Sequence, residues 1–192
     1  FNLKKKYDFS FTGNLHRTHG EYRYNVKKEL FKKYSLDMLS NKGLSALFKS
    51  NPIKNKFQKY HIHWAEWGSR TLTYKPMLPS GIEYARFMNQ SKVFLNTPSA
   101  IGLFNTRFFE LMATKSLIFC PVSDEYMGIL QDGYNCVMFK DDMSDFDDKL
   151  IKCIEDDDYR NGIINNAYNN VEIHSYDSRI KTLLKYIKGN ID

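Results

Sequence analysis

Short apolar runs alternate with amphipathic segments along most of this chain, which is the pattern of strand and helix units in an α/β protein. Apolar runs and two-residue alternation predict strands at residues 7–12, 36–39, 61–67, 92–96, 116–122 and 135–139. Apolar positions at helical spacing predict helices at residues 21–34, 81–91, 144–157, 157–171 and 176–188. Such elements joined by short links favour a parallel sheet covered by helices on both faces, so the predicted fold class is α/β.

Two helix starts carry their own sequence signals. Asn105 or Thr106 is placed to cap a further helix that runs to about residue 115. Ser144, followed by Asp147 three positions later, resembles the capping box that opens many helices. We therefore expect a helix to start at each of these points.

The composition is that of an ordinary globular domain, with 42% apolar and 26% charged residues among 192. No apolar run approaches the roughly 20 residues needed to cross a bilayer, and the first residues lack the order of a signal peptide. We interpret the chain as one soluble domain, residues 1–192, taken from a longer polypeptide. Its closing helices occupy about residues 157–188.

Cysteine and aspartate usage suggests a reduced compartment and no metal centre. Cys120, Cys136 and Cys153 are odd in number, widely spaced and set in apolar surroundings, which predicts reduced core thiols and a cytoplasmic location. The Asp-rich runs at 140–148 and 155–158 are interpreted as helix caps and solvated faces rather than metal ligands. No metal is expected.

Charge is distributed unevenly between the two halves of the chain. Residues 1–100 hold 18 Lys and Arg against 6 Asp and Glu, whereas residues 101–192 hold 10 against 16. The first half therefore favours an anionic partner, which could be a nucleic acid, a membrane surface or a phosphorylated small molecule. A solvated basic face explains the same excess without any partner.

The first candidate site is the glycine loop that follows the strand at 7–12. Gly13 allows backbone N–H groups to approach an anion closely, and His16 and Arg17 add donors around it. The spacing matches neither of the common phosphate-binding glycine motifs. A plain glycine turn with exposed basic residues is the alternative explanation.

The second candidate site is the long loop between the strand at 92–96 and the next helix. Gly102 frees the backbone, the helix start favours a phosphate, and Arg107 lies in the first turn with Glu110 one turn on. An ordinary intrahelical Arg/Glu pair is the alternative. It explains poorly why the two charges lie on an almost wholly apolar helix, because buried charges need partners. A nucleoside diphosphate, with its phosphates beside the arginine and its ribose beside the carboxylate, explains both residues.

These segments resemble a known family. Residues 91–121, the stretch DGYNCVMFKDD at 132–142 and the closing helices resemble the C-terminal half of GT-B glycosyltransferases, in particular group-one relatives that include spore-maturation-protein-like enzymes. The strand and glycine loop at 7–23 also resemble the start of that half. The resemblance is poor over residues 40–75. It implies a Rossmann-like three-layer α/β/α domain that binds a nucleotide sugar.

The resemblance assigns roles to single residues. Glu110 corresponds to the family glutamate that binds the nucleotide ribose, Arg107 to the basic residue near the donor diphosphate, and Gly13 to the glycine that approaches the same phosphates. Asn14, Arg17, Gly102, Asn105 and Thr106 complete the predicted donor-binding set. His16, from its place in the glycine loop, is the candidate catalytic or phosphate-contacting histidine, and an exposed loop imidazole is the alternative.

Two departures from the family pattern stand out. Many retaining members carry a glutamate eight positions before the ribose-binding one, and Gly102 stands there instead. The small-residue turn after the helix reads Ala113-Thr114-Lys115 here. The first departure leaves the stereochemistry of transfer open, and the second suggests a divergent member.

The resemblance implies a hexosyl- or deoxyhexosyltransferase that moves a sugar from a nucleoside diphosphate sugar to a glycan hydroxyl without a metal or other cofactor. The acceptor-binding half of such an enzyme is expected in an upstream domain of the same polypeptide, or this is a single-half variant. The competing hypothesis is a non-catalytic nucleotide- or RNA-binding module that uses the basic first half. The aromatic-interleaved signatures of single-strand binders are missing, so nucleic acid is not the expected partner.

Overall fold

The computed structural model describes residues 2–14, 36–37, 46–47, 49–50, 62–67, 81–99, 103–126 and 128–189. Its strands are β1 (Tyr7–Asn14), β2 (Leu36–Asp37), β3 (Ala46–Leu47), β4 (Lys49–Ser50), β5 (Ile62–Trp67), β6 (Ser91–Leu95), β7 (Leu117–Pro121) and β8 (Val137–Phe139). Its helices are α2 (Gly81–Asn89), α3 (Arg107–Ala113), η2 (Asp124–Tyr126), α4 (Phe146–Glu155), α5 (Asp157–Asn170), η3 (Val171–His174) and α6 (Tyr176–Gly189).

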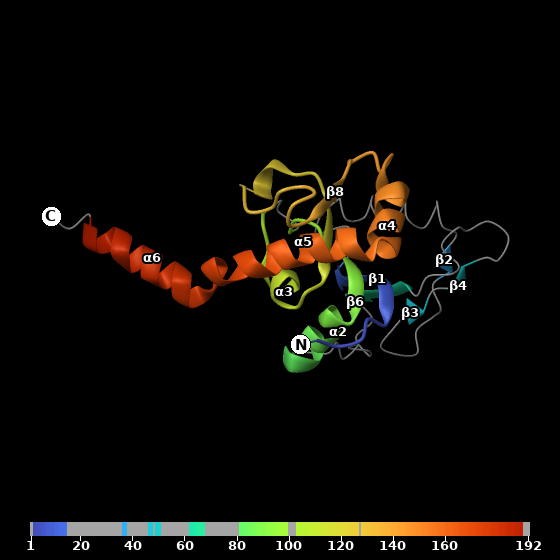
Figure 1. Ribbon diagram of the computed structural model, residues 1–192, viewed down its shortest axis with the longest axis horizontal. Helices are drawn as coiled ribbons and strands as arrows, with labels where there is room; N and C mark the ends of the chain where they lie inside the picture. Colours follow the sequence, from blue (N-terminus) through green and yellow to red (C-terminus); the bar gives the residue numbers. More distant parts are fainter. Residues whose placement is uncertain are drawn as a thin grey trace.

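Six of the strands form one sheet in the order β3-β5-β1-β6-β7-β8 (Figure 1). All neighbours in it pair in parallel except β3, which lies antiparallel to β5. β2 and β4 form a separate antiparallel pair. The predicted parallel sheet is therefore confirmed, and the short strand predicted at 36–39 lies outside it.

Alternating side chains of the strands build two separate core layers, one on each face of the sheet. One layer contains Phe9, Phe11, Val93, Leu95, Leu117, Phe119, Val137 and Phe139. The other contains Phe94, Ile118, Cys120 and Met138. Helices cover both faces of the sheet, as in other parallel sheets, so these strand side chains are buried on both.

The helices cover the two faces in distinct groups. Phe146, Leu150 and Cys153 of α4 pack on the first layer, whereas α2 and α3 pack on the second through Met88 and Phe108, among others. α5 reaches both layers. The predicted three-layer α/β/α arrangement is confirmed, and all three cysteines are free and buried, as expected.

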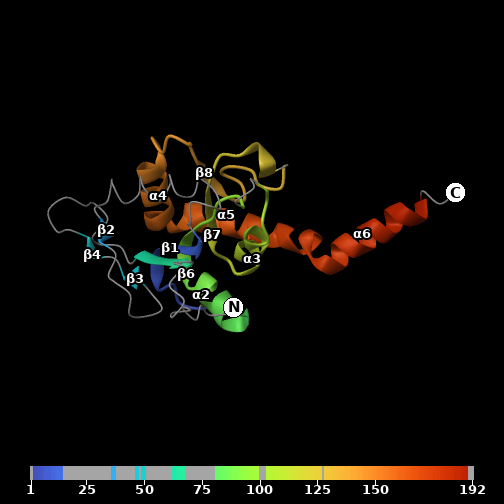
Figure 2. The same cartoon turned by 180° about the vertical axis from the view of Figure 1, so that it is seen from behind.

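The last helix departs from this compact arrangement. After α5 and η3 the chain turns, and α6 extends away from the sheet and the other helices (Figures 1 and 2). None of its residues is buried. No helix in the described ranges combines the length and the apolar character that a bilayer crossing requires.

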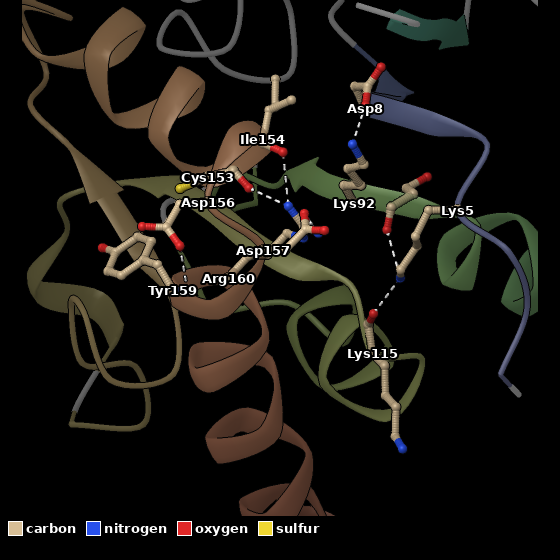
Figure 3. A network of polar contacts seen from close by, with 11 residues as sticks. Lys5, Asp8, Lys92, Lys115, Cys153, Ile154, Asp156, Asp157, Tyr159 and Arg160 are labelled. Atoms are coloured by element: carbon tan, nitrogen blue, oxygen red, sulfur yellow. Dashed lines mark hydrogen bonds and ion pairs between the residues drawn. The ribbon is translucent and has the colours of Figure 1, made fainter.

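Two basic side chains fasten the ends of helices to the rest of the fold (Figure 3). The buried Arg160 donates from Nη1 to the carbonyl oxygens of Cys153 at 3.0 Å and Ile154 at 2.9 Å, in the last turn of α4. Lys5 donates from Nζ to the carbonyl oxygens of Asn89 at 2.6 Å, Ser91 at 3.0 Å and Lys115 at 2.7 Å. These bonds satisfy carbonyl groups that helix and strand ends leave unpaired.

The capping-box prediction is wrong in detail. α4 begins at Phe146 with Asp145 at the capping position, and the Asp145 carboxylate accepts a hydrogen bond from the Lys140 backbone N–H at 2.9 Å rather than from the helix. The predicted cap, Ser144, therefore lies one residue before the capping position. Asp156 does cap α5, because its Oδ1 accepts from the Tyr159 N–H at 2.9 Å. The helix predicted at 21–34 lies outside the described residues.

Candidate functional site

Both candidate segments follow the carboxyl ends of neighbouring strands. β1 ends at Asn14 and β6 ends at Leu95, and the two strands pair in parallel, with Phe9 opposite Val93. Ligands of open parallel sheets bind at this edge, outside the strand ends. The topology therefore brings together two segments that lie about 90 positions apart in the sequence.

Arg107 connects these two segments directly. It is the first residue of α3, it is half-buried, and its Nη1 donates a hydrogen bond to the carbonyl oxygen of Thr12 at 2.5 Å. Its Nε is buried and has no hydrogen-bond partner in the described part of the chain. The guanidinium thus places a positive charge at the end of β1, with hydrogen-bonding capacity left over.

Gly13 lies beside this guanidinium. A Cβ at this position would come within 2.9 Å of the Phe11 ring and 3.5 Å of Arg107 Nη1. A side chain would have to displace the ring, so the packing of Phe11 beside this position favours glycine.

Glu110 lies one turn after Arg107 on α3, and its side chain is exposed. The structure contains no ion pair between these two residues, and Arg107 bonds to the strand instead. The simple intrahelical pair considered from the sequence is therefore not what the fold contains. An exposed carboxylate beside a fixed cation can accept hydrogen bonds from ligand hydroxyls.

Asn105 and Thr106 lie immediately before α3. Thr106 occupies the capping position but makes no capping hydrogen bond through its side chain. The Asn105 amide donates from Nδ2 to the Thr97 carbonyl at 2.8 Å and accepts at Oδ1 from Asn96 Nδ2 at 3.1 Å. The predicted helix start is confirmed, but neither side chain caps the helix.

Several predicted residues fall outside the described ranges. His16, Arg17 and Gly102 are among them. Asn14 is described as the last residue of β1, where it pairs with Trp67. For the candidate histidine and the rest of the first loop, the sequence remains the basis of prediction.

Sequence reasoning missed three residues that support the site. Thr12 receives the Arg107 bond through its carbonyl, and its hydroxyl lies 2.7 Å from the hydroxyl of Tyr84 on α2. Asn96 holds Asn105. The helix at 81–91 was predicted from the sequence, but Thr12, the partner of Tyr84, lies too far away along the chain to be identified from it.

The described residues bring no three His, Cys, Asp or Glu side chains together in a group that could hold a metal ion.

Residues 42–185 match the family model described as glycosyl transferase-like, and the chain therefore belongs to that family. A search of curated proteins gave no significant match. The structure has the fold of one half of a GT-B glycosyltransferase, and the resemblance seen in the sequence is confirmed at that level. The narrower assignment to spore-maturation-like enzymes stays a prediction.

The similar structures are distant in sequence. HepE from Anabaena, solved with UDP-glucose, has a TM-score of 0.53 and 11% identity over 94% of this chain and 40% of its own. The pneumococcal O-GlcNAc transferase GtfA, solved with UDP and GlcNAc, has a TM-score of 0.57 and 12% identity over 97% of this chain and 36% of its own. The C-terminal domain of LpcC from Francisella tularensis has a TM-score of 0.50 and 16% identity over 91% of this chain and 88% of its own. The chain thus spans well under half of HepE and GtfA.

Proposed function

We propose that this chain is the donor-binding half of a glycosyltransferase that moves a sugar from a nucleoside diphosphate sugar to a glycan hydroxyl. The observation that carries the proposal is that a fixed cation, Arg107, and an exposed carboxylate, Glu110, lie one turn apart on α3 at the carboxyl edge of the sheet. Membership of the glycosyl transferase-like family supports it. Two neighbours of the same fold were solved with UDP or UDP-glucose, which agrees with a nucleotide donor.

Each group has a definite part in the proposed reaction. Glu110 accepts hydrogen bonds from the ribose hydroxyls, and Arg107, Arg17 and the backbone at Gly13 and Asn14 lie against the diphosphate. Gly102 and Thr106 complete the proposed donor-binding set, and Asn105 belongs to it as well. The bond between the sugar and the phosphate oxygen breaks, and the acceptor oxygen bonds to the sugar carbon.

The charge that develops on the departing diphosphate is stabilised by these basic groups in the proposed mechanism. The acceptor hydroxyl loses its proton during the same reaction, and His16 is the residue proposed to take it, because an imidazole titrates near neutral pH. Its position in the first loop rests on the sequence.

The proposal is tested by Glu110→Gln, which keeps the size of the side chain and removes its charge. Loss of a charge-assisted hydrogen bond costs about 1.5–3 kcal/mol, so we expect binding of UDP or GDP to weaken by roughly 10- to 150-fold. Because Glu110 is exposed, the unfolding temperature of the unliganded variant should not change. Isothermal titration calorimetry measures the first effect and differential scanning fluorimetry the second.

Glu172 provides the matched control, since it is an exposed glutamate on η3, outside the proposed donor-binding set. Glu172→Gln should leave nucleotide affinity unchanged. Unchanged affinity in folded Glu110→Gln would overturn the assignment. If no nucleoside diphosphate stabilises the wild type and RNA does so in a salt-dependent manner, the competing RNA-binding function is correct.

We further infer that a second domain of the same polypeptide covers α6 in the complete protein. Ile180, Leu183, Leu184 and Ile187 recur at helical spacing and are all exposed. An exposed apolar stripe of this kind marks an interaction surface. HepE and GtfA, which align with nearly all of this chain, continue for more than half of their own length beyond it.

A further inference from the structure

The side-chain amide of Asn105 joins two parts of the candidate site that are eight positions apart in the sequence. Its Nδ2 donates to the carbonyl oxygen of Thr97 at 2.8 Å, and its Oδ1 accepts from Nδ2 of Asn96 at 3.1 Å. Asn96 and Thr97 are 1% and 2% exposed and directly follow β6. The donor and the acceptor of the Asn105 side chain are therefore both bonded to residues that directly follow β6.

The backbone of Asn105 is tied to α3 at the same time. Its carbonyl oxygen accepts a hydrogen bond from the Phe108 N–H at 3.2 Å, in the first turn of the helix. Two more hydrogen bonds join residues between β6 and α3. The Ser99 N–H donates to the Leu103 carbonyl at 2.8 Å, and the Leu103 N–H donates to Ser99 Oγ at 3.1 Å. The start of α3 thus has a fixed position relative to β6.

We propose that Asn105 is a positioning residue of the donor site, which holds the first turn of α3 against the end of β6 so that Arg107 and Glu110 face the nucleotide. This role rests on the proposed function and refines it, because Asn105 acts through its neighbours and does not touch the donor.

The role requires an amide and not merely a polar side chain. Thr97 offers an acceptor and Asn96 offers a donor, so the residue between them must donate and accept at once. A carboxylate keeps the bond from Asn96 but faces the Thr97 carbonyl without a proton to donate. It becomes able to donate only when protonated.

The test is Asn105→Asp, assayed for UDP and GDP binding by calorimetry between pH 8 and pH 5, with the wild type measured at each pH. At pH 8 we expect affinity about tenfold or more below the wild type, because the start of α3 is no longer held. The ratio to the wild type should shrink as the pH falls, because the protonated carboxyl group donates to the Thr97 carbonyl again. Asn105→Ala should show the same loss at pH 8 without recovery.

Asn135 is a matched control, because its buried amide also donates to a carbonyl, that of Ile129 at 2.8 Å, and accepts from the Gln131 N–H at 2.8 Å. It lies in the turn before β8, at the opposite end of the strands. Asn135→Asp should lower the unfolding temperature and leave nucleotide affinity of the folded protein at the wild-type value.

The outcomes separate the inference from the function on which it rests. Wild-type affinity in folded Asn105→Asp or Asn105→Ala at pH 8 overturns the positioning role, while Glu110→Gln still reports on donor binding. A wild type that binds no nucleoside diphosphate overturns the proposed function itself, and the role of Asn105 with it.

Discussion

Arg107 Nη1 donates a hydrogen bond to the carbonyl oxygen of Thr12 at 2.5 Å, and this bond joins the first residue of α3 to the carboxyl end of β1. The two residues are 95 positions apart. β6, which pairs with β1, ends at Leu95, and the guanidinium satisfies a backbone acceptor at the strand end. One side chain therefore fixes the geometry of the site and supplies its positive charge.

Replacing Arg107 by methionine should lower both stability and nucleotide affinity. The carbonyl of the buried Thr12 loses a charged donor, which costs about 1.5–3 kcal/mol of unfolding free energy. Urea unfolding measures the first effect and calorimetry with UDP the second. Arg86→Met is the control, because Arg86 forms an exposed pair with Glu83 on α2, and such pairs contribute about 0–1 kcal/mol. Equal stability of the Arg107 and Arg86 variants would contradict this account.

Gly13→Ala should lower stability by crowding. The added methyl group would lie 2.9 Å from the Phe11 ring, which packs in the core with Phe9. Overpacking of this kind costs about 1–3 kcal/mol, whereas Arg107, 3.5 Å from the new atom, makes only an ordinary contact with it. Urea unfolding checks the loss, and Gly162→Ala, in an open position on α5, should not show it.

Strand and helix positions were predictable because their signals are local. The apolar runs at 92–96 and 116–122 became β6 and β7, and the spacing at 176–188 became α6, because alternation and helical periodicity do not depend on distant residues. The bond from Arg107 to Thr12 depends on how distant segments are brought together in the fold. The sequence therefore showed only that Arg107 is a charge on an apolar helix, and could not identify Thr12 as its partner. Ser144 is not the cap because α4 starts one residue later than predicted, with Asp145 at the capping position.

Arg160→Ala should be among the more destabilising single changes in the domain. Arg160 is 4% exposed, and its Nη1 serves two carbonyl groups in the last turn of α4. Removing it leaves those acceptors unpaired and opens a cavity, for a loss of about 2–4 kcal/mol in urea unfolding. Asp157→Asn, which removes the exposed partner of the same guanidinium, should cost less than about 1 kcal/mol. A similar loss in both variants would place the energy in the ion pair instead.

The junction between η3 and α6 should weaken in mild acid. The His174 ring lies 4.9 Å from the Phe109 ring, and Arg179 lies over the same phenylalanine at 4.8 Å. Burial, and then the charge of Arg179, lower the pKa of His174 below its ordinary value of 6.5. The unfolded chain therefore binds the proton more readily, so stability is complete above about pH 6.5 and falls as the pH drops below it.

Hydrogen exchange of the α6 amides between pH 7.5 and pH 5.5, corrected for intrinsic rates, measures this opening. The opening of α6 should become more frequent in the wild type as the pH falls. His174→Gln removes the titrating group, and its opening should not depend on pH in this range. The same pH dependence in both proteins would show that other groups control the junction.

The exposed face of α6 provides the sharpest test of the inferred second domain. Leu183 and Leu184 are 56% and 49% exposed, so Leu183→Gln and Leu184→Gln should leave the unfolding free energy of the 192-residue chain within about 0.5 kcal/mol of the wild type. In a longer polypeptide that carries the second domain, each should lower it by about 1.5–3 kcal/mol, because burial of a leucine contributes that much. Lys181→Gln, on the polar face, is the control and should be neutral in both. If the short chain instead self-associates through this face, sedimentation will show a concentration-dependent dimer that the leucine variants abolish, and α6 is then an interface between copies.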